Sequence, residues 1–204
     1  MDTAPFPSHL EAIAIGASTG GIEALSELLP ALRDGLPATV AVVLHIAPAQ
    51  RSMLAALFAG RCALPVVEAD DKQPAEAGHV YFAPPDYHLQ AEGDRTWSLT
   101  QDEPVNHSRP SIDVLFETAA DVYGRGLLGI VLSGNSSDGT AGLLAIRRAG
   151  GITWAQDPDT APAPIMPRSA IEAGAADAVL PLAAMAAALR KLGTARGGAP
   201  ADQI

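Results

Sequence analysis

Short runs of apolar residues alternate along the chain with longer segments in which apolar residues recur every three or four positions. Continuous apolar runs are typical of buried strands, whereas the wider spacing predicts helices that bury one face. We therefore expect strands at 12–15, 38–46, 65–68, 79–82, 127–132, 152–155 and 178–180. We expect helices at 22–32, 51–60, 110–123, 141–149 and 182–192.

Strands that are apolar throughout are buried on both faces, as in a parallel sheet covered by helices on either side. The pattern predicts an α/β fold with a doubly wound, mainly parallel, Rossmann-like sheet. Two strand-like pieces, 87–90 and 96–100, flank Glu92, Gly93 and Asp94, which predicts a small β-hairpin. Ligands of such sheets bind beyond the carboxyl ends of the strands, so chemistry is expected there.

Length and composition indicate one main domain. We divide the 204 residues into an N-terminal extension (1–10), a domain (11–192) and a Gly-, Ala- and Pro-rich tail (193–204) expected to be disordered. The formal net charge of −10 argues against nucleic acid as a partner, because nucleic-acid-binding surfaces are basic. No signal-peptide pattern or membrane-length apolar run is present, so we expect a cytoplasmic protein without membrane insertion.

Residues 16–20 match the pattern G-x-S-x-G between the first strand and the first helix. In hydrolases this pattern places a serine on a sharp strand-to-helix turn, which makes Ser18 a candidate nucleophile. The N–H groups near Thr19, at the start of the helix, could face an oxyanion. The alternative is a phosphate-binding turn, but the glycines do not form G-x-G-x-x-G and His45 stands where an acidic ribose-binding residue is expected.

A serine nucleophile needs a base, because its hydroxyl is hardly ionised near neutral pH. His45 follows the second strand at its carboxyl end, on the rim where Ser18 is expected. His79 begins a strand and is expected on the opposite rim. His107, in a loop before a helix, is the best substitute, although residues 106–109 could instead line a substrate groove or cap the helix.

The third member of such a site is a carboxylate that orients the imidazole. Asp138 follows the strand at 127–132 through a Gly/Ser/Asn turn, so it is expected on the same rim. Its alternative role is to cap the helix that follows it. The order Ser18, His45, Asp138 differs from the Ser-Asp-His order of α/β-hydrolases, which disfavours the ordinary lipase fold. Cys62 is the only cysteine, and no metal site or cofactor is expected.

Several segments, in the same order, resemble the catalytic domain of the CheB chemotaxis methylesterase family. They are AIGASTGGIEAL (14–25), VLHIAP (43–48), HVYFAPPDYHL (79–89), NHSRPSIDVLFETAA (106–120), LSGNSSDGTAGL (132–143) and AQDPDTAPAPIMPRSAIEAGAADAVLPL (155–182). The resemblance implies a serine hydrolase whose triad is Ser18, His45 and Asp138. It implies that the substrates are glutamyl methyl esters on the cytoplasmic helices of chemoreceptors, with deamidation of receptor glutamines as a second activity.

The sequence departs from the family pattern in two places. The family's turn reads Gly-Met-Gly-x-Asp-Gly, but Asn135 stands at the Met position, which is associated with the oxyanion region. This change is the only support for the alternative function, a non-catalytic adaptor that binds receptor helices. The usual N-terminal receiver domain has no counterpart here, so we expect an open rim, activity independent of a phosphodonor, and any regulation to come from a separate protein.

Overall fold

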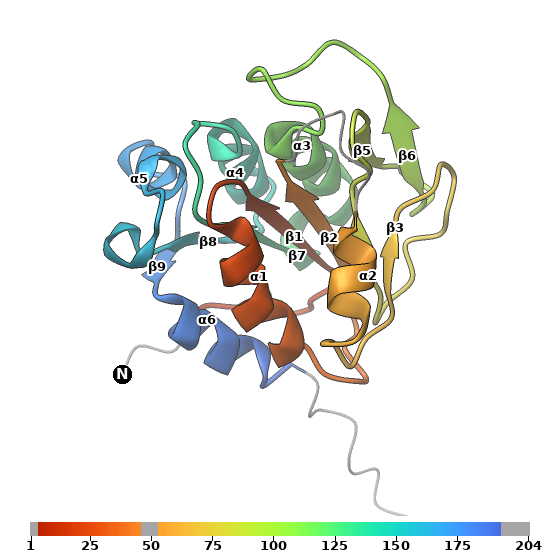
Figure 1. Ribbon diagram of the computed structural model, residues 1–204, viewed down its shortest axis with the longest axis horizontal. Coiled ribbons are helices and arrows are strands. Elements are labelled where there is room, and N and C mark those ends of the chain that lie inside the picture. The colour runs from red at the N-terminus through yellow and green to blue at the C-terminus, as the bar shows by residue number, and fades with distance from the viewer. Residues whose placement is uncertain (1–3, 46–52, 193–204) are drawn as a thin grey trace, which may run out of the picture.

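The structure, a computed structural model, describes residues 4–45 and 53–192. Its main sheet has seven parallel strands in the order β3-β4-β2-β1-β7-β8-β9 (Figure 1). A separate antiparallel hairpin pairs β5 (His88–Ala91) with β6 (Trp97–Thr100). The main-sheet strands are β1 (Ala12–Ala17), β2 (Thr39–Leu44), β3 (Val66–Glu68), β4 (Val80–Phe82), β7 (Leu127–Val131), β8 (Ile152–Gln156) and β9 (Ala178–Leu180).

Helices cover both faces of the sheet and bury two hydrophobic cores (Figure 1). One face carries α1 (Gly21–Leu28), α2 (Leu54–Ala59) and α6 (Leu182–Leu189). The other carries α3 (Ile112–Tyr123), α4 (Thr140–Arg148) and α5 (Ile165–Glu172). Short 3₁₀ helices span Leu29–Ala31, Gly124–Gly126 and Pro158–Thr160. No helix among residues 4–45 and 53–192 is long and apolar enough to cross a membrane.

Alternation along the central strands decides which way the residues after them point. In β1, Ile13, Ile15 and Ala17 pack into the core beneath α1, whereas Ala12 and Ala14 pack into the core beneath α3. Leu44, the last residue of β2, shares the core of Ala17. Because side chains alternate between faces of a strand, the residues that follow β1 and β2 are directed toward the side of α3 and α4.

The predicted fold class is confirmed, including the hairpin, and the main sheet is wholly parallel. The helix predicted at 22–32 is shorter, because the chain tightens into a 3₁₀ turn at Pro30. Helix α5 was not predicted from the sequence. It contains Pro167 in its first turn, where a missing N–H is tolerated because no intrahelical acceptor is available. Position 46, positions 51–52 and the tail from 193 lie outside the described residues.

Candidate active site

The sheet changes its direction of growth between β1 and β7. Strands β2 and β4 continue outward from one side of β1, and β7, β8 and β9 continue from the other. The carboxyl ends of two such strands enclose a crevice, since the connections leave them in opposite directions. Ser18 directly follows β1 at this point, and its N–H donates to the Ser133 carbonyl oxygen, 2.9 Å away, beyond the end of β7.

The turn after Ser18 leads directly into α1. Gly20, at the N-cap of α1, has φ 78°, a left-handed conformation that glycine adopts without steric penalty. The Ser133 hydroxyl donates to the Thr19 carbonyl oxygen at 2.7 Å and thereby fixes the turn. The N–H groups of Thr19 and Gly20 donate no hydrogen bond to any described residue. They can therefore serve an anion placed above the turn.

His45 lies beside Ser18 because β1 and β2 are paired in register. Ala17 is opposite Leu44, so the next pair along the two strands is Ser18 and His45. The His45 N–H donates to the Ala17 carbonyl oxygen at 3.0 Å, which extends this pairing to His45. Neighbouring strands lie about 4.8 Å apart, and partners in register point to the same face. The two side chains are thus directed to one side of the rim.

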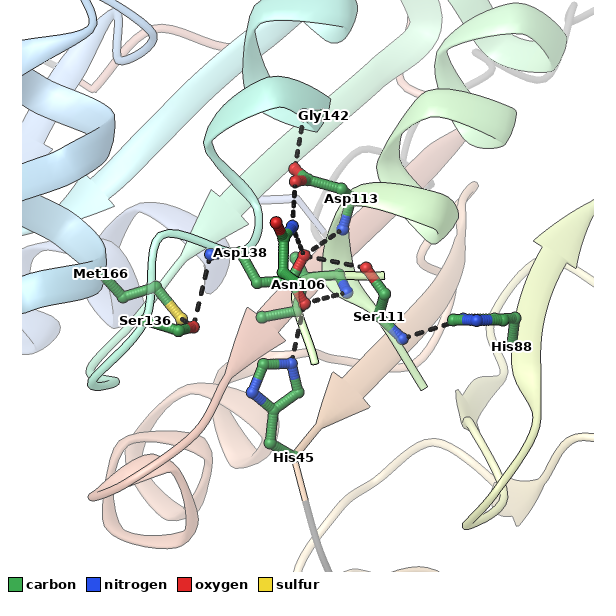
Figure 2. Close-up of polar contacts among 10 residues, drawn as sticks. His45, His88, Asn106, Ser111, Asp113, Ser136, Asp138, Gly142 and Met166 are labelled. Carbon is green, nitrogen blue, oxygen red and sulfur yellow. Dashed lines mark hydrogen bonds and ion pairs between the residues drawn. The ribbon is translucent and has the colours of Figure 1, made fainter. Parts of the chain in front are cut away.

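Asp138 forms a partly buried pair with His45. Its Oδ2 accepts a hydrogen bond of 2.8 Å from His45 Nε2 (Figure 2), and the Asp138 side chain is fully buried. The same carboxylate accepts the N–H groups of Ile112 at 2.7 Å and Asp113 at 3.0 Å, the first two residues of α3. The Ser111 hydroxyl adds a third bond, of 2.8 Å to Oδ1. Asp138 therefore caps the N-terminus of α3.

These contacts determine the charge of Asp138. Burial opposes ionisation, but the hydrogen bonds from His45, the Ile112 N–H and Asn106 outweigh it and lower the pKa of Asp138 to about 2. An ionised carboxylate accepts only, so His45 Nε2 carries the hydrogen and Nδ1 is the nitrogen that can take a proton. Asp138 thereby fixes both the orientation and the tautomer of the imidazole.

Comparison with known proteins assigns the chain to a family. The sequence profile described as CheB methylesterase matches residues 13–189. The chain belongs to the CheB methylesterase family. The crystal structure of the Thermotoga maritima CheB methylesterase catalytic domain superposes with a TM-score of 0.85 and 34% identity, covering 90% of this chain and 98% of that one.

Relatives in the family differ in length. A protein-glutamate methylesterase/protein-glutamine glutaminase of Bordetella pertussis is 43% identical over 183 residues, which are 88% of this chain but 52% of the relative. The chain thus spans about half the length of that relative. A relative from Leptospira interrogans is 45% identical over 174 residues, which are 85% of this chain and 90% of its own length.

Of the predicted contacts in this CheB-type site, the one between His45 and Asp138 is confirmed. No hydrogen bond joins Ser18 Oγ to His45 among the described residues, although such bonds often tighten only when substrate binds. Asp138 caps α3 and not α4, which begins at Thr140 after Gly139 at its N-cap, without a side-chain cap. The alternative prediction, that Asp138 caps the helix that follows it, is therefore wrong: the helix that it caps is α3.

The segment 106–109 does not act as one surface. Val105 and Ser108 bond each other through both backbone N–H groups, with Asn106 and His107 at positive φ between them, which is a type I′ turn. Asn106 turns its amide inward to Asp138 (Figure 2). His107 is exposed and does not take the place of His45. Arg109 pairs with Asp86 at 2.7 Å.

The sequence did not predict the contacts that several polar residues of this CheB-type rim make. Ser133 fixes the turn of Ser18, and Ser111 and Asn106 bond Asp138. Their roles depend on contacts between segments distant in sequence, so no local motif identifies them. Thr19 and Asn135, assigned to the oxyanion region, are both exposed. Among residues 4–45 and 53–192, no group of three His, Cys, Asp or Glu side chains is arranged to hold a metal ion.

Proposed function

We propose that the chain is a serine hydrolase that demethylates glutamyl methyl esters on the cytoplasmic helices of chemoreceptors. The observation that carries the proposal is the partly buried 2.8 Å hydrogen bond between His45 and Asp138, with His45 opposite Ser18 where the pairing of β1 and β2 continues. A histidine held by an ionised carboxylate beside a serine is the arrangement that activates a hydroxyl as a nucleophile. Membership of the CheB methylesterase family supports the choice of ester.

The reaction proceeds in two steps through an acyl-enzyme. His45 Nδ1 takes the proton of Ser18 Oγ as the oxygen attacks the glutamyl ester carbonyl, and the tetrahedral intermediate collapses with loss of methanol. The imidazolium returns its proton to the departing methoxide, and Asp138 stabilises the imidazolium while it exists. Water activated by His45 then releases the glutamate carboxyl group and regenerates Ser18.

Negative charge develops on the carbonyl oxygen in both steps. The N–H groups of Thr19 and Gly20 are suitably placed to receive it, since no described residue occupies them and they lie at the positive end of the α1 dipole. The backbone of Asn135, on the facing loop, is the second proposed source of a donor. A receptor glutamine presents the same carbonyl with ammonia as the leaving group, so deamidation follows the same route.

The test is methanol release from a methylated receptor fragment by the purified chain. We expect Ser18→Ala to reduce kcat by at least about 1,000-fold, because the nucleophile cannot be replaced by the remaining groups. Ser26→Ala is the matched control, since the hydroxyl of this serine of α1 donates to the Ile22 carbonyl oxygen and accepts from Arg61, both away from Ser18 and His45. Unchanged methanol release by Ser18→Ala would remove Ser18 from the mechanism.

The same assay addresses the adaptor alternative. Tight binding of the fragment by the wild-type chain without methanol release would support an adaptor and contradict the esterase. Ammonia release from the corresponding glutamine fragment, measured with the same two variants, tests the deamidase activity.

A further inference from the structure

A second buried carboxylate lies beside Asp138 and has no part in the mechanism above. Asp113, in the first turn of α3, is 6% exposed, and Asp138 is 0% exposed. Two carboxylates buried side by side repel each other unless donors lie between them. The contacts that make this pair tolerable therefore bear directly on the position of Asp138.

Asn106 lies between the two carboxylates. Its Nδ2 donates to Asp113 Oδ2 at 2.7 Å and to Asp138 Oδ1 at 3.0 Å (Figure 2). An amide NH₂ group has two hydrogens, so one side chain satisfies both acceptors at once. The backbone of Asn106 has φ 51°, a left-handed conformation that asparagine tolerates better than most residues. The turn therefore directs a donor pair at the carboxylates.

The two carboxylates also cap each other's helices. Asp138, which directly precedes Gly139 and α4, accepts N–H groups of α3, whereas Asp113 of α3 accepts the N–H of Gly142 in α4 at 2.7 Å. A Cβ at Gly142 would lie 2.4 Å from Phe116 Cβ, so the helices approach closely at this point. This exchange of caps ties the start of α4, and with it Asp138, to the start of α3.

The charges agree with this arrangement. Burial raises the pKa of Asp113 to about 6, and the neighbouring Asp138 adds to the effect, although the Gly142 N–H opposes it. Glu117 of α3 contributes further negative charge. Above this pKa, two carboxylates face each other across the Asn106 amide, with His45 on the far side of Asp138. The single NH₂ group of Asn106 is thus the donor shared by both.

We propose that Asn106 and Asp113 are positioning residues that hold the Asp138 carboxylate in its hydrogen bond with His45. The inference rests on the proposed function only for its kinetic consequences. Asn106 orients Oδ1 of Asp138 through its amide hydrogen bond. Asp113 in turn holds the Asn106 amide and the Gly142 N–H near the N-terminus of α4. Among the described residues, neither side chain hydrogen-bonds Ser18.

Asn106→Asp is the sharpest variant. It keeps the shape of the side chain and the tolerance of positive φ, but it replaces the shared donor by a third carboxylate. We expect kcat to fall roughly 10- to 100-fold with KM nearly unchanged, because a displacement of about 1 Å in reacting groups can reduce a rate by about 100-fold. We also expect the pH profile of kcat to move, since an added negative charge stabilises the imidazolium.

A second readout requires no substrate. The proton on His45 Nε2, hydrogen-bonded to Asp138, should give a low-field NMR signal, assigned by its loss in His45→Gln. We expect Asn106→Asp to shift or broaden this signal. The signal should be unchanged in the control Asp177→Asn, which alters a carboxylate that caps the Thr153 N–H at 2.9 Å and pairs with Arg147 at 2.8 Å.

The exchange variant Asn106→Asp with Asp113→Asn separates positioning from folding. It re-forms the bond between positions 106 and 113 with donor and acceptor exchanged, so the unfolding free energy should partly recover. Asp138 still lacks its donor from position 106, so kcat should remain low. Recovery of kcat together with stability would overturn the proposal, because the pair would then be purely structural.

The remaining outcomes are also decisive. An unchanged NMR signal in Asn106→Asp, or a rise in KM with kcat unchanged, would overturn the positioning role. Absence of methanol release in the wild-type chain would contradict the proposed function instead. In that case the NMR signal would still show whether Asn106 holds Asp138 against His45.

Discussion

The N-termini of α1 and α3 lie on the same rim of the sheet and are treated in opposite ways. At α3, the N–H groups of Ile112 and Asp113 are taken by the Asp138 carboxylate, at 2.7 and 3.0 Å. At α1, the N-cap is a glycine without a side-chain cap, and Thr19 and Gly20 donate to no described residue. Both helix ends carry partial positive charge.

The difference separates a resident anion from a transient one. The occupied end of α3 stabilises a permanent carboxylate, which then has a fixed orientation toward His45. The open end of α1 is available for charge that develops only during reaction, and donors that are already oriented need no reorganisation at that moment. One rim thus uses the same backbone chemistry once for structure and once for the proposed catalysis.

Asp138→Asn breaks the occupied end and should have the largest effect. An amide in this position cannot both accept from His45 Nε2 and satisfy the N–H groups of α3, so the imidazole loses its tautomer and α3 loses its cap. We expect kcat for methanol release to fall by about 10,000-fold. We expect the free energy of unfolding to fall by about 1–3 kcal/mol, measured by denaturant titration. A loss of kcat below tenfold would show that His45 does not depend on Asp138.

Ser133→Ala loosens the open end. The hydroxyl donates to the Thr19 carbonyl oxygen at 2.7 Å and accepts the Ala163 N–H at 2.9 Å, so it fixes the peptide that joins Thr19 to Gly20. A misplacement of about 1 Å in reacting groups can reduce a rate by about 100-fold, so we expect a fall in kcat of roughly 10- to 100-fold. Steady-state kinetics on the methylated fragment check this, and a change confined to KM would contradict it.

The proposed catalytic residues of this rim could be predicted from the sequence, whereas the contacts around Asp138 could not. Ser18, His45 and Asp138 could be placed on one rim because each follows an apolar run, and parallel strands bring their carboxyl ends together. The acceptors and donors around Asp138 could not. Asn106 and Asp113 meet it only because α3 and α4 exchange caps, and no local spacing encodes that contact. Helix α5 was missed because Pro164 and Pro167 interrupt the usual helical signal.

The pH dependence of stability distinguishes the two carboxylates at the N-terminus of α3. The pKa of Asp113 is raised from 3.8 to about 6, so its contribution to stability is complete below pH 3.8 and is lost as the pH rises through about 6. The pKa of Asp138 is lowered to about 2, so its own contribution is lost only as the pH falls from 3.8 through about 2.

Between pH 3.8 and about 6, Asp113 is the member of the Asp113–Asp138 pair that titrates. The free energy of unfolding of the wild-type chain should therefore fall by a larger amount between about pH 4 and pH 6 than that of Asp113→Asn. Denaturant titrations of both proteins across this range measure the difference. Parallel curves would show that Asp113 is not responsible for the slope.

His107→Gly should have the smallest effect and tests the turn that carries Asn106. His107 has φ 61° and is exposed, so its side chain contributes strain to the turn without a buried contact. A left-handed conformation costs a non-glycine residue about 1–2 kcal/mol, and the greater freedom of glycine in the unfolded chain offsets roughly 0.5–1 kcal/mol of the relief. We expect the free energy of unfolding to rise by no more than about 1 kcal/mol, with kcat retained.

Asn106→Gly is the matched comparison at the adjacent position of the same turn. It relieves the same kind of backbone strain but deletes the amide that bonds Asp113 and Asp138 at 2.7 and 3.0 Å. Stability and kcat should both fall, whereas His107→Gly should raise stability slightly and retain kcat. If His107→Gly lost activity instead, His107 would have to be reconsidered as the base. If the two variants behaved alike, the turn would matter only for its backbone.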